Sequence, residues 1–123
     1  MVQTLFVLAV GAILGAFSRF FFTHISTQLS KHYGFPYGTL AVNVLGSLMV
    51  GFVLSSTSDR FMDDRWRLFL ATGFCGAFTT FSAFAFESTS YLREGRASMF
   101  LLNFALNNLL SMLAVFGGIR LAK

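Results

Sequence analysis

Four long apolar stretches dominate this sequence of 123 residues and limit what it can fold into. They cover residues 3–23, 38–56, 67–92 and 98–119. About 20 helical residues cross the hydrocarbon core of a bilayer, so each stretch is long enough for a transmembrane helix. Only 11% of the residues are charged, against about 25% in a typical soluble domain. We therefore predict an all-α membrane protein with a single transmembrane domain over residues 1–123.

The charged and reactive residues argue against several classes of function. The net charge is +4, but the basic residues are scattered along the chain, so no nucleic-acid partner is expected. The single cysteine, Cys75, excludes an intrachain disulfide and a cysteine-rich metal site. The sequence shows neither a nucleotide-binding glycine loop nor a plausible Ser/His/Asp set, so we expect no enzymatic activity.

An even number of spans places both termini on one side of the membrane. The basic residues on that side are Arg60, Arg65, Arg67, Arg120 and Lys123, and those on the opposite side are Lys31, Arg93 and Arg96. This positive-inside bias is weak, which favours insertion in both orientations and antiparallel pairing of two copies. Four helices alone hardly enclose a polar pathway, so we expect an oligomer.

Small and polar side chains recur every four residues in the second and fourth stretches. They are Asn43, Ser47 and Gly51 in the second stretch and Asn103, Asn107 and Ser111 in the fourth. Residues at this spacing share one helix face. Two interpretations remain open for the second stretch. Its asparagine either forms a hydrogen bond to a neighbouring helix or donates from its amide to a passing solute. In the fourth stretch, the length of the row favours a polar track along a path, because helix contacts need only one or two such groups.

Gly11, Gly15 and Arg19 share one face of the first stretch. The two glycines predict the close approach of another helix. Arg19 lies near the far end of the stretch, where two interpretations stay open. Its side chain either extends to the lipid headgroups or supplies positive potential to a vestibule for anions.

The third stretch carries an unusual polar set at membrane depth. Residues 73–87 include two glycines, three hydroxyl side chains and a carboxylate. Uncompensated polar groups in a bilayer cost on the order of several kcal/mol each, so this segment is a candidate functional site. In a continuous helix the hydroxyls would bond back to carbonyls one turn earlier. In a helix interrupted near Gly76 and the Thr79–Thr80 pair, backbone groups would become available to a cavity or an ion.

A row of aromatic side chains follows this segment. Phe81, Phe84, Glu87 and Tyr91 share one helix face. A phenylalanine stripe at helical spacing is more often part of a packed core than of a pore. This stripe, however, continues into a carboxylate, which an apolar packing face does not need.

Taken together, these motifs resemble those of the Fluc (CrcB) fluoride channels. Residues 73–84, followed by Glu87, are similar to the central signature of that family. Further similarities lie at Gly11, Gly15 and Arg19, at residues 38–43, and at residues 101–103 with Asn107. The resemblance covers essentially the whole chain in the family's order. One departure is Ala83, where family members often have threonine.

The resemblance implies a fluoride-selective channel for passive export of cytoplasmic fluoride. It implies an antiparallel, dual-topology homodimer with two pores, embedded in the lipid of a bacterial inner membrane, with the third helix broken at the signature. It also implies a structural Na⁺ at the dimer interface, held by the backbone carbonyls of Gly76 and Thr79. Together with the polar track, the expected fluoride pathway consists of Asn43, Thr80, Phe81, Ser82, Phe84, Glu87, Asn103, Asn107 and Ser111, with Arg19 in the vestibule.

Two other functions remain as alternatives. A small proton-coupled multidrug-type exporter also has four short helices, but such proteins carry an acidic residue in the first span, and this chain has none there. A non-transporting assembly protein of the membrane would not need polar faces on three of its spans.

Overall fold

The computed structural model describes residues 1–56 and 62–123, and all regular structure within them is helical. Arg60, counted above on the terminal side, lies outside the described residues. The helices are α1 (Val2–Tyr33), α2 (Tyr37–Ser55), α3 (Asp64–Arg67), the π-helix η1 (Leu68–Cys75), α4 (Gly76–Phe78), α5 (Phe81–Arg93) and α6 (Ala97–Leu121). Four stretches of helix are long and apolar enough to span a membrane, namely α1, α2, Asp64–Arg93 and α6.

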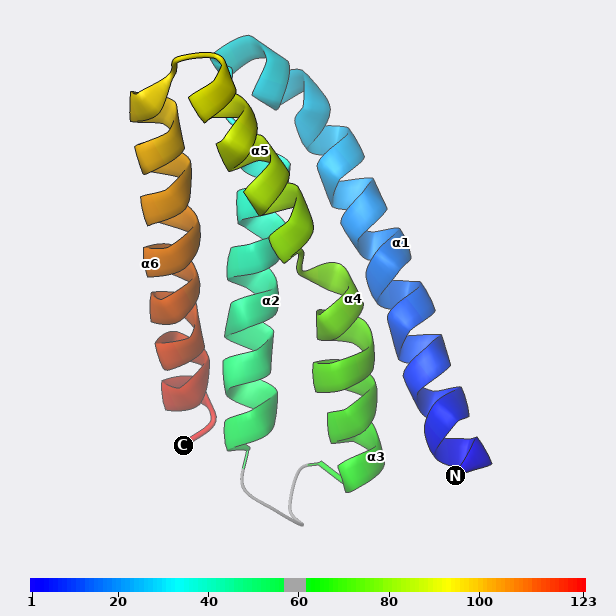
Figure 1. The fold of residues 1–123 in the computed structure, drawn as a ribbon. Helices are drawn as coiled ribbons and strands as arrows, with labels where there is room; N and C mark the ends of the chain where they lie inside the picture. Colours follow the sequence, from blue (N-terminus) through cyan, green and yellow to red (C-terminus); the bar gives the residue numbers. More distant parts are fainter. Residues whose placement is uncertain (57–61) are drawn as a thin grey trace.

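The four spans lie side by side as an open bundle (Figure 1). Both chain termini lie at the same end, and the α1–α2 and α5–α6 turns lie at the other, as an even number of spans requires. Helix α6 packs on α2, and α1 packs on η1 and α4. The third span therefore lies between α1 on one side and α2 on the other in its first half.

Helix α1 is longer than the sequence pattern predicted. The first apolar stretch was expected to end at residue 23, but α1 continues to Tyr33 and ends at Gly34, whose φ of 67° is left-handed. No glycine or proline interrupts the segment before Gly34, so nothing in it stops the helix. Two of its hydroxyls are satisfied locally, since Ser26 and Thr27 donate to carbonyls four residues earlier.

The third span is assembled from several pieces. Helix α3 leads into the π-helix η1, which the sequence analysis did not anticipate, and α4 follows directly. Thr79 and Thr80 then adopt extended backbone, with φ/ψ of −80°/158° and −148°/117°. Helix α5 begins at Phe81, and the Thr80 hydroxyl caps it by accepting from the Ala83 N–H at 3.2 Å.

The predicted close approach of a helix at Gly11 and Gly15 is confirmed, and the approaching element is η1. A Cβ added at Gly15 would collide with the Phe74 carbonyl, and one added at Gly11 would lie 2.6 Å from the Phe69 carbonyl oxygen. Backbones in contact at this range leave no room for a side chain. The two glycines therefore fix where the first half of the third span sits.

Helices α2 and α6 approach each other in the same way. A Cβ on Gly51 would meet the Val115 carbonyl, and one on Gly118 would meet the Leu48 carbonyl. This contact brings the polar rows of the two helices to the same interface, which matters for the site described below.

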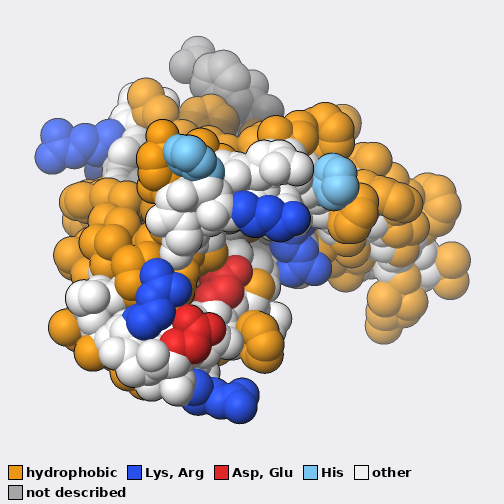
Figure 2. All heavy atoms as spheres, turned by 90° about the horizontal axis from the view of Figure 1, so that it is seen from above, with side chains coloured by type: hydrophobic (Ala, Val, Ile, Leu, Met, Phe, Trp, Pro, Cys, Tyr) orange, Lys and Arg blue, Asp and Glu red, His pale blue; other side chains and the backbone are white. Residues whose placement is uncertain are grey.

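The outer surface of the bundle is apolar and its loop end is charged. Large hydrophobic side chains along α1 and α6 are exposed, including Phe17 (69%) and Phe116 (66%). Figure 2 shows the end that carries the α1–α2 and α5–α6 turns, where basic and acidic side chains gather between the apolar flanks. Such a division matches a protein whose flanks face lipid or another apolar surface.

The α2–α6 contact gives a direct test of glycine packing. We expect Gly118→Ala to lower the free energy of unfolding by about 1–3 kcal/mol, because the new methyl group overlaps backbone atoms of α2. Gly117→Ala is the matched control, since its Cβ would make only an ordinary 3.6 Å contact with the Leu48 side chain. Unfolding of both variants in detergent checks this, and equal stability of the two would contradict the packing.

Candidate functional site

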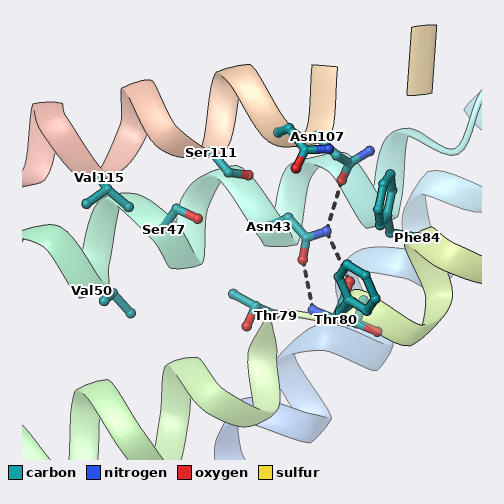
Figure 3. Close-up of a pocket in the computed structure, with 11 residues that line it drawn as sticks. Asn43, Ser47, Val50, Thr79, Thr80, Phe84, Asn107, Ser111 and Val115 are labelled. Carbon is teal, nitrogen blue, oxygen red and sulfur yellow. Dashed lines mark hydrogen bonds between the residues drawn. The ribbon is translucent and has the colours of Figure 1, made fainter. Parts of the chain in front are cut away.

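A hollow of about 300 Å³, lined by both apolar and polar side chains, lies where α4 gives way to α5 (Figure 3). We call it the central hollow. Its lining comes from α2, α6, the α4–α5 connection and the start of α5: Asn43, Ser47, Val50, Thr79, Thr80, Phe81, Phe84, Asn107, Asn108, Ser111 and Val115. Seven of the residues expected on the pathway or at the cation site meet here, namely Asn43, Thr79, Thr80, Phe81, Phe84, Asn107 and Ser111.

The Asn43 side chain pairs with the backbone of Thr80. The Thr80 N–H donates to Asn43 Oδ1 at 2.8 Å, and Asn43 Nδ2 donates to the Thr80 carbonyl at 3.1 Å (Figure 3). In a continuous α-helix the Thr80 N–H would bond the Gly76 carbonyl. Asn43 therefore replaces a helix hydrogen bond at the point where the helix is interrupted.

A chain of amides continues from Asn43 into α6. Asn43 Nδ2 donates to Asn107 Oδ1 at 2.9 Å, so both hydrogens of its NH₂ group are engaged within the chain. Asn107 Nδ2 donates in turn to the side chain and the backbone carbonyl of Asn103. Asn103 lies fully buried behind the central hollow and donates to Ser88 Oγ at 3.0 Å. The structure thus brings Asn103 into the network but not into the lining.

The hydroxyl groups of the hollow have fewer hydrogen-bond partners than the amides. Ser111 Oγ is buried and has no hydrogen-bond partner among the described residues. Figure 3 shows Ser47 and Ser111 near each other on α2 and α6, on the same side of Asn43. An unpartnered hydroxyl in a hollow is available to a solute that accepts a hydrogen bond.

Phe81 and Phe84 line the same hollow in different ways. Their ring centroids are 5.6 Å apart with the planes at 61°. Phe84 is buried at 7% exposure, whereas Phe81 is 78% exposed. Only one of the two rings is therefore held by the surrounding protein, and most of the Phe81 ring is exposed at the surface of the bundle.

Four of the expected residues line a second hollow of about 610 Å³, and one of them, Thr80, also lines the central hollow. We call this the lateral hollow, and it is lined in part by Arg19, Ser82 and Glu87. Glu87 Oε1 accepts a hydrogen bond of 2.5 Å from the Thr39 hydroxyl, while its Oε2 is buried without a partner in the described part of the chain. The predicted stripe is thus divided, since the two phenylalanines face the central hollow and Glu87 does not.

The carbonyls expected to bind a cation lie at the helix interruption. Gly76 is exposed, and a Cβ built on it would have nothing within 4 Å. Its carbonyl lacks the usual helix partner because the Thr80 N–H bonds Asn43 instead. The Thr79 carbonyl lies 3.4 Å from Arg19 Nη1. The Arg19 side chain therefore reaches the interruption itself.

Sequence reasoning missed two residues that hold this site together. Thr39 bonds Glu87, and Ser88 ends the amide chain. Thr39 carried a detectable signal, because it lies one helical turn before Asn43 and extends the polar row of α2. Ser88 carried none, since a lone serine next to a carboxylate has no distinguishing pattern.

Comparison with known proteins points to one family. A family model described as "CrcB-like protein, Camphor Resistance (CrcB)" matches residues 6–119. A relative from Legionella pneumophila named "Fluoride-specific ion channel FluC" is 47% identical over 116 residues, which is 94% of this chain and 86% of the relative. Relatives of the same name from Koribacter versatilis and Campylobacter lari are 42% and 37% identical, and the alignments cover 89% and 100% of this chain and 86% and 100% of the relatives.

The pairing of Asn43 with Thr80 can be tested by an isosteric change. Asn43→Asp replaces the donor nitrogen by an oxygen that faces the Thr80 carbonyl and Asn107 Oδ1. We expect stability to fall by about 1–3 kcal/mol or more, because two buried acceptors lose their donor. The control is Asn108→Asp, whose exposed side chain bonds only a carbonyl of its own helix. Thermal unfolding in detergent measures both, and a stability loss no larger at Asn43 than at Asn108 would contradict the pairing.

Proposed function

The chain belongs to the CrcB family, and we propose that it is a fluoride-selective channel through which cytoplasmic fluoride leaves the cell passively. It is a multi-pass bacterial membrane protein with four spans. The observation that carries the proposal is the central hollow, which gathers neutral hydrogen-bond donors and two phenylalanine rings at a helix interruption inside a membrane bundle.

The chemistry of the central hollow suits a small, strongly hydrated anion. A pore must replace the water around fluoride with donors, yet bind weakly enough to release the ion. Hydroxyls and amides donate without the deep well of a buried lysine or arginine. The unpartnered Ser111 hydroxyl is one such donor. Asn43 can supply another only if the ion displaces the Thr80 carbonyl or Asn107 Oδ1.

Phe81 and Phe84 serve in this proposal as aromatic edges along the fluoride path. The quadrupole of an aromatic ring is positive at its edge, so a ring edge can face an anion. The buried Phe84 ring is fixed in position, while the exposed Phe81 ring requires another surface to hold it.

A second copy of the chain is the surface proposed to cover Phe81. The central hollow is open on one side, and large apolar side chains surround the bundle. An antiparallel homodimer inserted in both orientations would close two such hollows and form two pores, which agrees with the weak charge bias of the loops. The interruption between α4 and α5 is then the functional break of the third helix.

A structural Na⁺ is proposed at the same break. Na⁺ is a hard cation that prefers oxygen ligands, and the Gly76 carbonyl is released from regular helix bonding next to open space. The Thr79 carbonyl lies in extended backbone and would exchange its contact with Arg19 for the ion. One protomer offers too few such ligands, so the partner would supply the rest. The bound ion would contribute a fixed positive charge and neutralise carbonyl dipoles at the dimer interface.

The lateral hollow is proposed as the vestibule of the pathway. Arg19 supplies positive potential there, which raises the local concentration of anions. Glu87 and Ser82 line the same hollow, and the bond from Thr39 holds the Glu87 carboxyl group to one side. Asn103 is assigned to the pathway only through the residues that it positions.

Passive export follows from the chemistry of hydrogen fluoride. Neutral HF crosses membranes and ionises inside the cell, and a channel lets the trapped anion leave down its electrochemical gradient. Channel transport makes and breaks no covalent bond, so the protein is not an enzyme. The proton-coupled exporter is not favoured, because the family is different and the first span has no acidic residue.

The first test is fluoride efflux from liposomes that contain the purified protein, read with a fluoride electrode. Valinomycin carries compensating K⁺, and chloride efflux is measured in parallel. We expect fast fluoride release with negligible chloride release and no need for a proton gradient. Folded protein that releases no fluoride would overturn the proposal, and transport that depends on a proton gradient would support the exporter.

The roles of the two phenylalanines can be tested in the same assay. Phe81→Ile and Phe84→Ile remove a ring edge but keep an apolar side chain. An interaction of about 1 kcal/mol per ring corresponds to roughly a fivefold loss of flux. Phe116→Ile is the control, because that side chain is 66% exposed on α6, away from the hollow. Dimer content is followed by size-exclusion chromatography, and full flux in both test variants would remove the rings from the pathway.

A further inference from the structure

We propose that Ser88 and Asn103 are positioning residues that orient the pathway amides of Asn107 and Asn43 through a one-directional chain of hydrogen bonds. Neither residue touches the central hollow, and both are almost completely buried, at 4% and 0% exposure. The proposal concerns the orientation of these amides. Its test by fluoride flux rests on the proposed function.

The direction of the chain is fixed at one end by the backbone. The Thr80 N–H can only donate, so the Asn43 atom that it meets must be the oxygen, Oδ1. Asn43 Nδ2 therefore points the other way, toward Asn107, and the atom it meets there must be an acceptor. An amide cannot be reversed at either position without placing two donors or two acceptors against each other.

The same logic carries the orientation to α5. With Asn107 Oδ1 facing Asn43, Asn107 Nδ2 faces Asn103 and donates to its Oδ1 at 2.9 Å and its carbonyl at 3.1 Å. Asn103 Nδ2 is then left to donate to Ser88 Oγ at 3.0 Å. Apart from the return bond from Asn43 Nδ2 to the Thr80 carbonyl, every bond runs from donor to acceptor in one sense, from the start of α5 through α2 and α6 and back to the middle of α5.

Because Ser88 and Asn103 are buried, losing a hydrogen bond at this end of the chain affects the other amides. An amide N–H with no partner inside a membrane protein is costly, so loss of the Ser88 oxygen leaves Asn103 with an unsatisfied donor. Asn103 can relieve this donor only by turning its amide out of the chain, which withdraws its Oδ1 from Asn107. Asn107 Nδ2 then keeps only the Asn103 backbone carbonyl as an acceptor, so Asn107 Oδ1 holds the Asn43 amide less firmly in the orientation in which it faces the central hollow.

The chain therefore sets how readily Asn43 can give a hydrogen to an ion. Hydrogen bonds in a row polarise one another, so each donor along the chain strengthens the next. Ser88 acts on the ion pathway from behind, although it faces no solute itself. If Ser88 only packed α5 against α6, its replacement would change stability but would not change the orientation of the Asn43 amide.

A double-mutant cycle on fluoride flux tests the relay. We expect Ser88→Ala to lower flux per folded protein by about threefold to tenfold, the range typical of coupled neighbours. In an Asn107→Ala background the same change should cost nothing further, because the chain is already cut. Ser90→Ala is the matched control, since its hydroxyl bonds only the Phe86 carbonyl of its own helix. Equal losses from Ser88→Ala in both backgrounds, or no loss in the wild-type background, would overturn the relay.

A spectroscopic measurement tests the same proposal without any flux. In ¹⁵N spectra of the detergent-solubilised protein, Ser88→Ala should shift the side-chain NH₂ signals of Asn107 and Asn43, and Ser90→Ala should not. In the wild-type protein, the side-chain NH₂ hydrogens of Asn103 and Asn107 should exchange slowly with D₂O. Unmoved Asn43 signals in folded Ser88→Ala would refute the relay. Fast exchange in the wild-type protein would refute it too, and that measurement does not depend on whether Ser88→Ala folds. Failure of the wild-type protein to release fluoride would instead count against the proposed function alone.

Discussion

The structure depends on the way one peptide group is satisfied at membrane depth. Where α4 ends and α5 begins, the Thr80 N–H has no helix carbonyl to bond, and the bilayer offers no water to replace it. The Asn43 side chain supplies both an acceptor and a donor to the Thr80 backbone, at 2.8 and 3.1 Å. With that pairing in place the third span can stop and restart, so that extended backbone and a new helix start lie in the middle of an apolar bundle.

The packing of the other helices can be understood from this requirement. Asn43 reaches Thr80 only if α2 lies close against the interruption, and Gly46 permits this because a Cβ there would collide with the Thr79 side chain. Asn43 also needs an acceptor for its second hydrogen, and Asn107 provides it from α6. The glycine contact between Gly51 and the backbone of α6 brings that helix near enough. Close backbone packing thus serves the hydrogen bonds as well as the helix contacts themselves.

The sequence predicted the spans and the polar rows because these follow from hydropathy and helical spacing alone. It also predicted that glycines of α1 would meet another helix, which is η1. It did not predict that α1 would continue to Tyr33, because polarity suggested a connection although nothing in the segment stops a helix. The π-helix was missed because nothing in the sequence of its residues, Leu68–Cys75, distinguishes them from an apolar α-helix. The division between the two hollows could not be foreseen either, since it depends on the rotation of α5 after the interruption, which brings Phe84 and Glu87 to different cavities.

The distribution of used and unused donors suggests how such a site could bind an anion without trapping it. The amides of Asn43 and Asn107 have each of their hydrogens engaged, whereas the Ser111 hydroxyl beside them has no partner among the described residues. An arriving anion could accept a hydrogen bond from the Ser111 hydroxyl without breaking an existing bond, but it would gain an amide hydrogen only by breaking one. The net gain from that exchange is small, because a lost hydrogen bond of about 1 kcal/mol offsets most of the new one. A pathway built in this way replaces hydration stepwise and keeps each site shallow, which is the condition for an ion both to enter and to leave.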